Sequence, residues 1–124
     1  MRLRFLYVGS SDVPRDRDRY VAALGASVVW DLHGFGANVA ALRMGEGPLV
    51  LLASHRPAPS TMPVYEVPDL GAAKRALEAA GWEPDAEVEI PNGPCLVLHD
   101  ASGNALALFE DVRPGALGGE RDAA

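Results

Sequence analysis

The chain has 124 residues, of which 48% are hydrophobic, so it is long enough to bury one core and is predicted to form a single domain. Its formal net charge of −6 and its lack of any Lys or Arg block argue against nucleic acid or an anionic membrane as partner, because phosphate groups require clustered positive charge. The longest apolar run, residues 49–53, is far shorter than the roughly 20 residues of a membrane-spanning helix, and no secretory leader is recognised, so a cytoplasmic protein is expected.

The first half of the chain reads as a strand, a helix and three further strands. Asp12 is a typical helix N-cap residue, and the helical pattern after it ends at Gly25. Turn residues separate the short apolar segments that flank this helix. The predicted strands cover residues 3–8, 27–32, 38–44 and 49–54.

The second half repeats this order, with Asp69 as the cap and Gly81 at the helix end. Its predicted strands cover residues 62–67, 86–90, 95–99 and 105–109. Because one helix covers only one face of such a sheet, two βαβββ units are expected to pair and to line a shared cleft between curved mixed sheets. The sequence therefore predicts an α+β fold: one domain over residues 1–112, with modules at about 1–57 and 60–112, and a flexible tail at 113–124.

Four motifs accompany this duplicated order. They are Asp12 with Tyr20 and Leu24-Gly25, the run Val-Tyr-Glu-Val-Pro-Asp-Leu at 64–70, Ala-Ala-Gly at 79–81, and Asp-Ala-Ser-Gly-Asn at 100–104 before Leu106 and Leu108. In these features the chain resembles the vicinal oxygen chelate superfamily, which includes glyoxalase I, extradiol dioxygenases, fosfomycin-resistance enzymes and bleomycin-resistance proteins. Ala101 stands where proline is common in the family's turn. The resemblance implies a glyoxalase-like fold over about residues 3–112.

Metal-dependent members of this superfamily bind one divalent ion in the cleft, through His and Glu or Gln side chains on the first and last strands of each module. The resemblance assigns these positions to Phe5, Leu51, Met62 and Ala107, with Ala53 in place of Leu51 if the register slips by two. Such side chains offer no oxygen or nitrogen ligand, and a lone thioether suits only soft metals. We therefore expect no ordinary metal site and no cofactor.

The two-residue period of a strand predicts which side chains face the cleft together with these four positions. Most of them are apolar, and the polar tips of Tyr7 and Glu66 indicate an open cavity, because burying them without partners would be costly. Glu66 favours a ligand with a positive charge or an N–H donor. The alternative is a cleft filled by its own apolar side chains. The face on which Trp30 lies is left open. The candidate ligand-binding residues are Phe5, Tyr7, Trp30, Leu51, Met62, Val64, Glu66, Ala107 and Phe109.

The remaining residue types with metal or catalytic chemistry are three histidines and one cysteine. His33, His55 and His99 each lie beside a predicted turn, which is typical of exposed or locally hydrogen-bonded histidines. Cys95 lies in an apolar stretch and is expected to be buried as a packing residue.

Three functions remain open at this stage. The preferred one is a small-molecule-binding protein similar to the bleomycin-resistance members, a metal-free homodimer that sequesters a small hydrophobic or aromatic drug or metabolite without catalysis. The second is an enzyme, either metal-free with Glu66 or Tyr7 as a weak candidate acid or base, or a lyase or dioxygenase of the superfamily's type with displaced or absent metal ligands. The third is a module with a filled cleft that acts through a protein partner.

Overall fold

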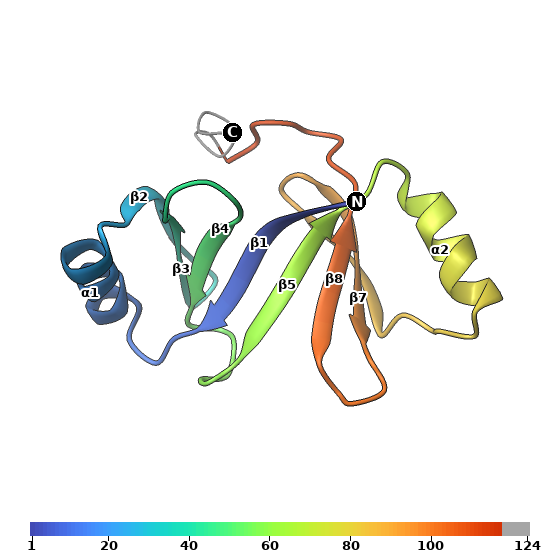
Figure 1. Cartoon of the computed structure of the whole chain (residues 1–124), viewed down its shortest axis with the longest axis horizontal. Helices are drawn as coiled ribbons and strands as arrows, with labels where there is room; N and C mark the ends of the chain where they lie inside the picture. Colours follow the sequence, from blue (N-terminus) through green and yellow to red (C-terminus); the bar gives the residue numbers. More distant parts are fainter. Residues whose placement is uncertain (118–124) are drawn as a thin grey trace.

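The computed structural model, which describes residues 1–117, contains an eight-stranded curled sheet with a helix at each side (Figure 1). The strands follow the order β2-β3-β4-β1-β5-β8-β7-β6 across the sheet. In chain order the elements are β1 (Arg2–Gly9), α1 (Val13–Leu24), β2 (Ser27–Gly34), β3 (Ala37–Arg43), β4 (Leu49–Ala53), β5 (Thr61–Glu66), α2 (Leu70–Ala79), β6 (Ala86–Ile90), β7 (Gly93–His99) and β8 (Ala105–Phe109).

The sheet is built from two βαβββ modules, as predicted. In each module the first strand pairs in parallel with the last one, β1 with β4 and β5 with β8, while the other pairs within a module are antiparallel. The modules meet where β1 pairs with β5 in antiparallel orientation. This pairing joins the two halves into one continuous sheet, and the predicted α+β class is confirmed.

The two helices begin with the same local device. The side chain of Asp12 accepts a hydrogen bond from the backbone N–H of Arg15 at 3.1 Å, and Asp69 accepts one from Ala72 at 3.0 Å. Each carboxylate satisfies an N–H group that has no partner within the helix. Helix α1 ends at Gly25, whose φ of 70° is readily adopted only by glycine.

Apolar side chains form three clusters, one on the inner face of the sheet and one beneath each helix. The cluster beneath α1 includes Leu42 and Leu52, and the cluster beneath α2 includes Leu96 and Leu98. The inner cluster, on the face away from the helices, consists of Phe5, Ala41, Leu49, Leu51, Met62, Val64, Cys95, Ala107 and Phe109. Because successive strand residues point to opposite faces, a strand such as β4 supplies Leu51 to the inner cluster and Leu52 to the cluster beneath α1.

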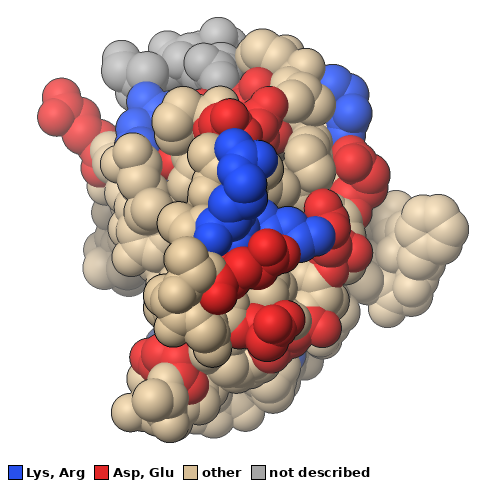
Figure 2. Space-filling model, turned by 90° about the vertical axis from the view of Figure 1, so that its right-hand side faces the viewer, with Lys and Arg blue, Asp and Glu red and all other residues tan. Residues whose placement is uncertain are grey.

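The outer surface over α2 carries no block of one charge. Figure 2 shows Lys and Arg side chains next to Asp and Glu side chains on this face, and Lys74 pairs with Glu87 at 3.2 Å. Opposite charges interleaved in this way are a solvated surface, and exposed pairs of this kind contribute little to stability. Within residues 1–117, no helix is long and apolar enough to cross a membrane.

The chain after β8 crosses above the upper ends of the strands toward the first module (Figure 1). Arg113 holds it to the second module, since its guanidinium donates to the carbonyl oxygens of Pro91 and Ile90, at 2.8 and 3.0 Å, and pairs with Glu89. The predicted flexible tail over residues 113–124 stays a prediction, and its part at 118–124 lies outside the described residues.

Candidate functional site

A cavity of about 200 Å³ lies on the inner face of the sheet, with walls from both modules. Most of its lining atoms belong to apolar side chains, which is typical of a small-molecule site. Seven of the nine candidate ligand-binding residues line it: Phe5, Tyr7, Trp30, Leu51, Met62, Val64 and Ala107. Their placement agrees with the two-residue period used to choose them, whereas their role in binding stays a prediction.

A row of facing residues runs across the sheet from β2 to β5 at one wall of this cavity. Trp30 pairs with Ala41, Ala41 with Leu51, Leu51 with Tyr7, and Tyr7 with Met62. Ala41 is fully buried and small, which leaves space on the inner face beside the Trp30 indole. The facing of Trp30, which the sequence leaves open, is therefore toward the cavity.

The four positions at which the resemblance would put metal ligands are all buried in the inner cluster. Phe5, Leu51, Met62 and Ala107 offer apolar surface and one thioether, which do not bind a hard divalent ion. Among residues 1–117, no group of three or more His, Cys, Asp or Glu side chains is arranged to hold a metal ion. The residues present do not fit the superfamily's metal site, so chemistry in this cavity would depend on its own side chains.

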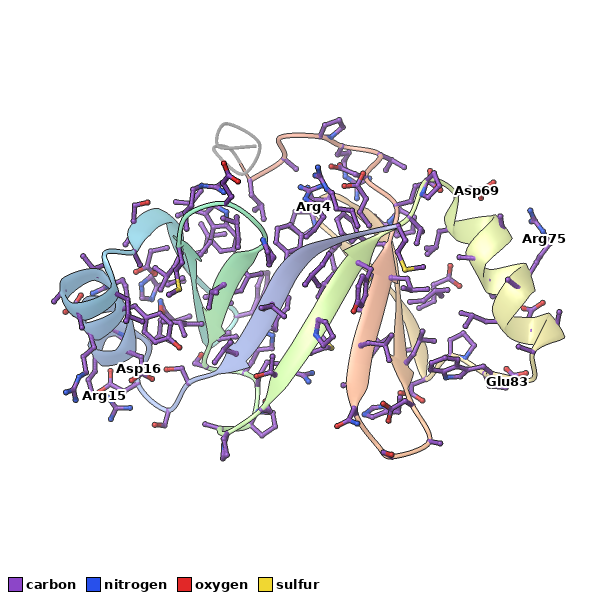
Figure 3. The ribbon with its side chains drawn as sticks, in the orientation of Figure 1. Arg4, Arg15, Asp16, Asp69, Arg75 and Glu83 are labelled. Atoms are coloured by element: carbon purple, nitrogen blue, oxygen red, sulfur yellow. The ribbon has the colours of Figure 1, made fainter. Side chains whose placement is uncertain are left out.

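Glu66 does not line the cavity, contrary to expectation. A β-bulge in β1 between Leu3 and Phe5 shifts the register against β5, and the buried Arg4 side chain lies over the rings of Phe5 and Phe109 at 5.2 and 5.6 Å. Arg4 pairs with Glu66 and, at 3.2 Å, with Asp111. Figure 3 places Arg4 at the upper end of the sheet, between the modules. The Glu66 carboxylate is thus engaged by a cation at the edge of the inner cluster.

Phe109 also lies outside the cavity lining. Its ring is fully buried and stacks against Phe5, with ring centroids 5.7 Å apart. The strand period assigns Phe109 correctly to the inner face, but Phe5 and Arg4 cover it. It supports the cavity wall from behind.

The polar end of the cavity is formed by Tyr7, His55 and Arg56. The Tyr7 and His55 rings meet edge to face, with centroids 6.0 Å apart. Burial raises the pKa of the Tyr7 hydroxyl above its usual value of 10.0, the nearby Cys95 raises it further, and the positive charge of Arg56 opposes both effects. Tyr7 is therefore a proton-bearing hydrogen-bond donor at neutral pH.

Sequence reasoning missed His55 and Arg56 as cavity residues. His55 continues the alternation of Leu49, Leu51 and Ala53 on the inner face, so the strand period contains a signal for it. Arg56 lies in the loop between β4 and β5, where no period applies. His33 and His99 lie outside the cavity, as expected for locally hydrogen-bonded histidines: His33 contacts Asn38, and His99 pairs with Asp85.

The second module supplies an apolar wall that the sequence also failed to identify. Val88 and Ile90 of β6 and the following Pro91 line the cavity, together with Val97 of β7 and Leu117 from the last described segment. Val88 and Ile90 alternate as strand residues should, but β6 is an edge strand whose short sequence contains two glutamates. The composition of β6 therefore gave little indication of a cavity wall.

Cys95 is buried in the inner cluster and lines the cavity. Burial raises the pKa of its thiol from 9.0 to about 11. The thiol is therefore protonated at neutral pH and does not serve as a base or as a reactive nucleophile.

Cys95 is expected to react with iodoacetamide at pH 8 about 100-fold more slowly than an ordinary thiol, because its thiolate fraction is lower by that factor. Mass spectrometry of the intact protein measures this rate directly, since Cys95 is the chain's single cysteine. The same protein in guanidinium chloride is the control. Equal rates in the native and the denatured protein would contradict the buried placement.

The fold, but not the sequence, is similar to that of known proteins. No protein-family model matches the chain, and no protein of curated function matches it by sequence. Among solved structures, methylmalonyl-CoA epimerase from Mycobacterium tuberculosis matches with a TM-score of 0.74 and 18% identity, over 94% of this chain and 92% of that one. A variant of Streptomyces coelicolor methylmalonyl-CoA epimerase in complex with 2-nitronate-propionyl-CoA matches with a TM-score of 0.72 and 14% identity, over 91% and 96%. A hypothetical protein from Bacillus halodurans matches with a TM-score of 0.71 and 15% identity, over 88% and 93%.

The fold is glyoxalase-like. The epimerases share this fold of the vicinal oxygen chelate superfamily, so the resemblance stated from the sequence is confirmed at the level of the fold. The preferred functional prediction, a metal-free protein that sequesters a drug or metabolite, is wrong, because several of the similar structures are methylmalonyl-CoA epimerases, which are enzymes, and two of these are complexes with methylmalonyl-CoA or 2-nitronate-propionyl-CoA. That prediction was in error because it took apolar side chains at the four metal-ligand positions to mean that catalysis had been lost. The predicted homodimer stays a prediction.

Proposed function

We propose that the chain is an enzyme of the vicinal oxygen chelate type that transfers a proton at the carbon next to a carbonyl group of a small substrate. The observation that carries this proposal is the contact between Tyr7 and His55 at the polar end of an otherwise apolar cavity. Support also comes from the named activity of the similar structures, because epimerases of a CoA thioester are enzymes that act on a carbonyl compound.

In this mechanism His55 is the general base. Its imidazole takes the proton from the carbon next to the carbonyl, and the electron pair of that C–H bond moves to form an enolate. The imidazolium exchanges its proton with solvent and returns one, either to the same carbon, which exchanges the α-hydrogen, or to another atom of the enolate, which isomerises the substrate. No oxidant, reductant or second substrate is needed.

Tyr7 is the hydrogen-bond donor to the enolate oxygen. Its pKa is raised by burial, so the hydroxyl keeps its proton while negative charge develops on the substrate. The apolar walls around it exclude water, and an interaction with a developing charge is stronger in such a setting than in bulk solvent. His55 is exposed at the cavity's edge, where its imidazolium can be hydrated between the two proton transfers.

The direct test is exchange of the substrate's α-hydrogen with solvent. The protein is incubated in D₂O with methylmalonyl-CoA or with short 2-oxo acids such as 2-oxobutyrate, and the α-hydrogen signal is followed by NMR. We expect loss of this signal at a rate proportional to protein concentration. Exchange at the buffer rate for every compound would contradict the proposal.

The Tyr7→Phe variant is expected to lower the exchange rate by about 10-fold to 100-fold, because the enolate oxygen loses a donor. The loss should be constant from pH 7 to about 9, since the raised pKa of Tyr7 keeps it protonated over this range. Tyr20→Phe is the matched control, because Tyr20 lies on α1, packs against the cluster beneath that helix and does not line the cavity. An unchanged rate in Tyr7→Phe would remove the hydroxyl from the mechanism.

A further inference from the structure

The cavity is lined by five polar side chains among the described residues, those of Tyr7, Trp30, His55, Arg56 and Asn92, and one of them carries a permanent positive charge. No Asp or Glu is among the described residues that line it, although the chain as a whole carries a net charge of −6. Arg56 supplies the positive charge, while Glu66, the carboxylate expected in the cleft, is held by Arg4 outside the cavity. The electrostatics at this site therefore oppose the net charge of the chain and favour an anion.

Two donor groups of these side chains are buried without a partner among residues 1–117. They are the indole Nε1 of Trp30 and the guanidinium Nε of Arg56. A buried donor that has lost its water and gained no acceptor destabilises the folded protein, so such groups are rare unless a ligand satisfies them. Both residues line the same cavity, which makes a ligand with at least two acceptor atoms the natural partner.

The cavity is also divided between the modules by polarity. The permanent charge of Arg56 and the indole N–H of Trp30 come from the first module. The wall from the second module is mainly apolar, although the Asn92 amide also lines it. A ligand that satisfies both walls has an acidic end and an apolar body. The difference between the two walls sets the orientation of the ligand, whose acidic end points toward β2 and the loop between β4 and β5.

We propose that the cavity binds a small carboxylate with an apolar body, whose charge lies at Arg56 and whose acceptor atoms receive hydrogen bonds from Arg56 Nε and Trp30 Nε1. Because this is the cavity to which proton transfer is assigned above, the inference rests on that function and names its substrate class, a carbonyl compound that bears a carboxylate. From the sequence, Glu66 led us to expect a ligand with a positive charge or an N–H donor. The ligand proposed here is instead an anion.

The carboxylate site can be tested by comparing the binding of two ligands of equal shape, which requires no catalytic activity. Hexanoate and hexanamide differ in charge and not in length, and isothermal titration calorimetry gives the dissociation constant of each for the full-length protein. Hexanoate is expected to bind about 10- to 100-fold more tightly, as a charge-assisted hydrogen bond requires. Equal affinities, tighter binding of the amide, or no saturable binding of hexanoate up to about 10 mM would overturn the proposal.

Two variants assign the effect to its donors. Arg56→Gln is expected to bring the two dissociation constants together, whereas Arg19→Gln, on the exposed surface of α1, should leave them apart. Trp30→Phe keeps an aromatic ring but loses the N–H, and is expected to weaken hexanoate binding about 3- to 10-fold. A preference for hexanoate that persists in Arg56→Gln would overturn the assignment, and thermal denaturation shows whether each variant is folded.

Binding and exchange can fail separately. If hexanoate is preferred but no carbonyl compound exchanges its α-hydrogen, the carboxylate site stands and the proposed function is lost. If exchange occurs while hexanoate and hexanamide bind equally, the function stands and the carboxylate site is lost.

Discussion

His55→Gln is expected to lower α-hydrogen exchange by about 10²- to 10⁴-fold, the range that a positioned general base contributes. Glutamine retains hydrogen-bonding groups near the Tyr7 ring but cannot accept a proton at neutral pH. His55 is exposed at the edge of the cavity, so the substitution removes no buried side chain and should leave the free energy of unfolding within about 0.5 kcal/mol of the original. NMR measurement of exchange in D₂O and urea unfolding together separate lost chemistry from lost structure.

His33→Gln is the matched control, because His33 is also exposed but lies near Asp31 on β2, outside the cavity. Its exchange rate should equal that of the unchanged protein. A second readout distinguishes a base from a merely structural residue: free imidazole added to a His55→Ala variant is expected to restore part of the exchange rate. A rate in His55→Gln within about threefold of the original would leave the cavity without its proposed base.

The fold was predictable because its determinants are local and occur twice. Asp12 and Asp69 are short polar residues just ahead of a helical pattern, and both act as N-caps in the structure. The alternation of apolar residues assigns Phe5 and Met62 to the inner face, since a strand turns successive side chains to opposite sides. A pattern that repeats in one chain constrains the topology more strongly than either copy alone.

The site was predicted only in part, because two of its features depend on contacts between distant residues. The β-bulge that accompanies the buried Arg4 has no signature in the sequence, and Arg4 engages Glu66 and Asp111, 62 and 107 residues away. The strand period therefore placed Glu66 on the correct face of the sheet, but it could not predict the ion pair with Arg4. Arg56 lies in a loop, where only the folded chain shows that its side chain enters the cavity.

The functional error has a related cause. Comparing single positions with the superfamily's metal ligands detects the loss of one set of groups, but it does not detect other groups that enter the same cavity from different elements. Here β1 brings Tyr7 and the loop after β4 brings His55, and neither position carries a ligand in the assignment from the resemblance. A catalytic function is thus compatible with four apolar ligand positions.

Gly9→Ala is expected to lower the free energy of unfolding by about 2–4 kcal/mol and to reduce both exchange and carboxylate binding. A Cβ at Gly9 would lie 1.9 Å from the carbonyl oxygen of Pro57 and 2.6 Å from its carbonyl carbon. Both atoms are backbone, so the loop between β4 and β5 must move to accept the methyl group. This loop carries His55 and Arg56, and the backbone N–H of Gly9 donates to Ser60 at its far end.

The stability loss and the activity loss therefore have one origin, and Gly34→Ala provides the control for both. Gly34 also ends a strand, but a Cβ there meets no atom within 4 Å, and the variant should change the free energy of unfolding by less than about 0.5 kcal/mol. Urea unfolding followed by tryptophan fluorescence measures both variants. If Gly9→Ala unfolded at the same urea concentration as Gly34→Ala, the close approach of the loop to β1 would be wrong. The placement of Arg56 and His55 at the cavity would then be wrong with it, because this approach sets the position of the loop that carries them.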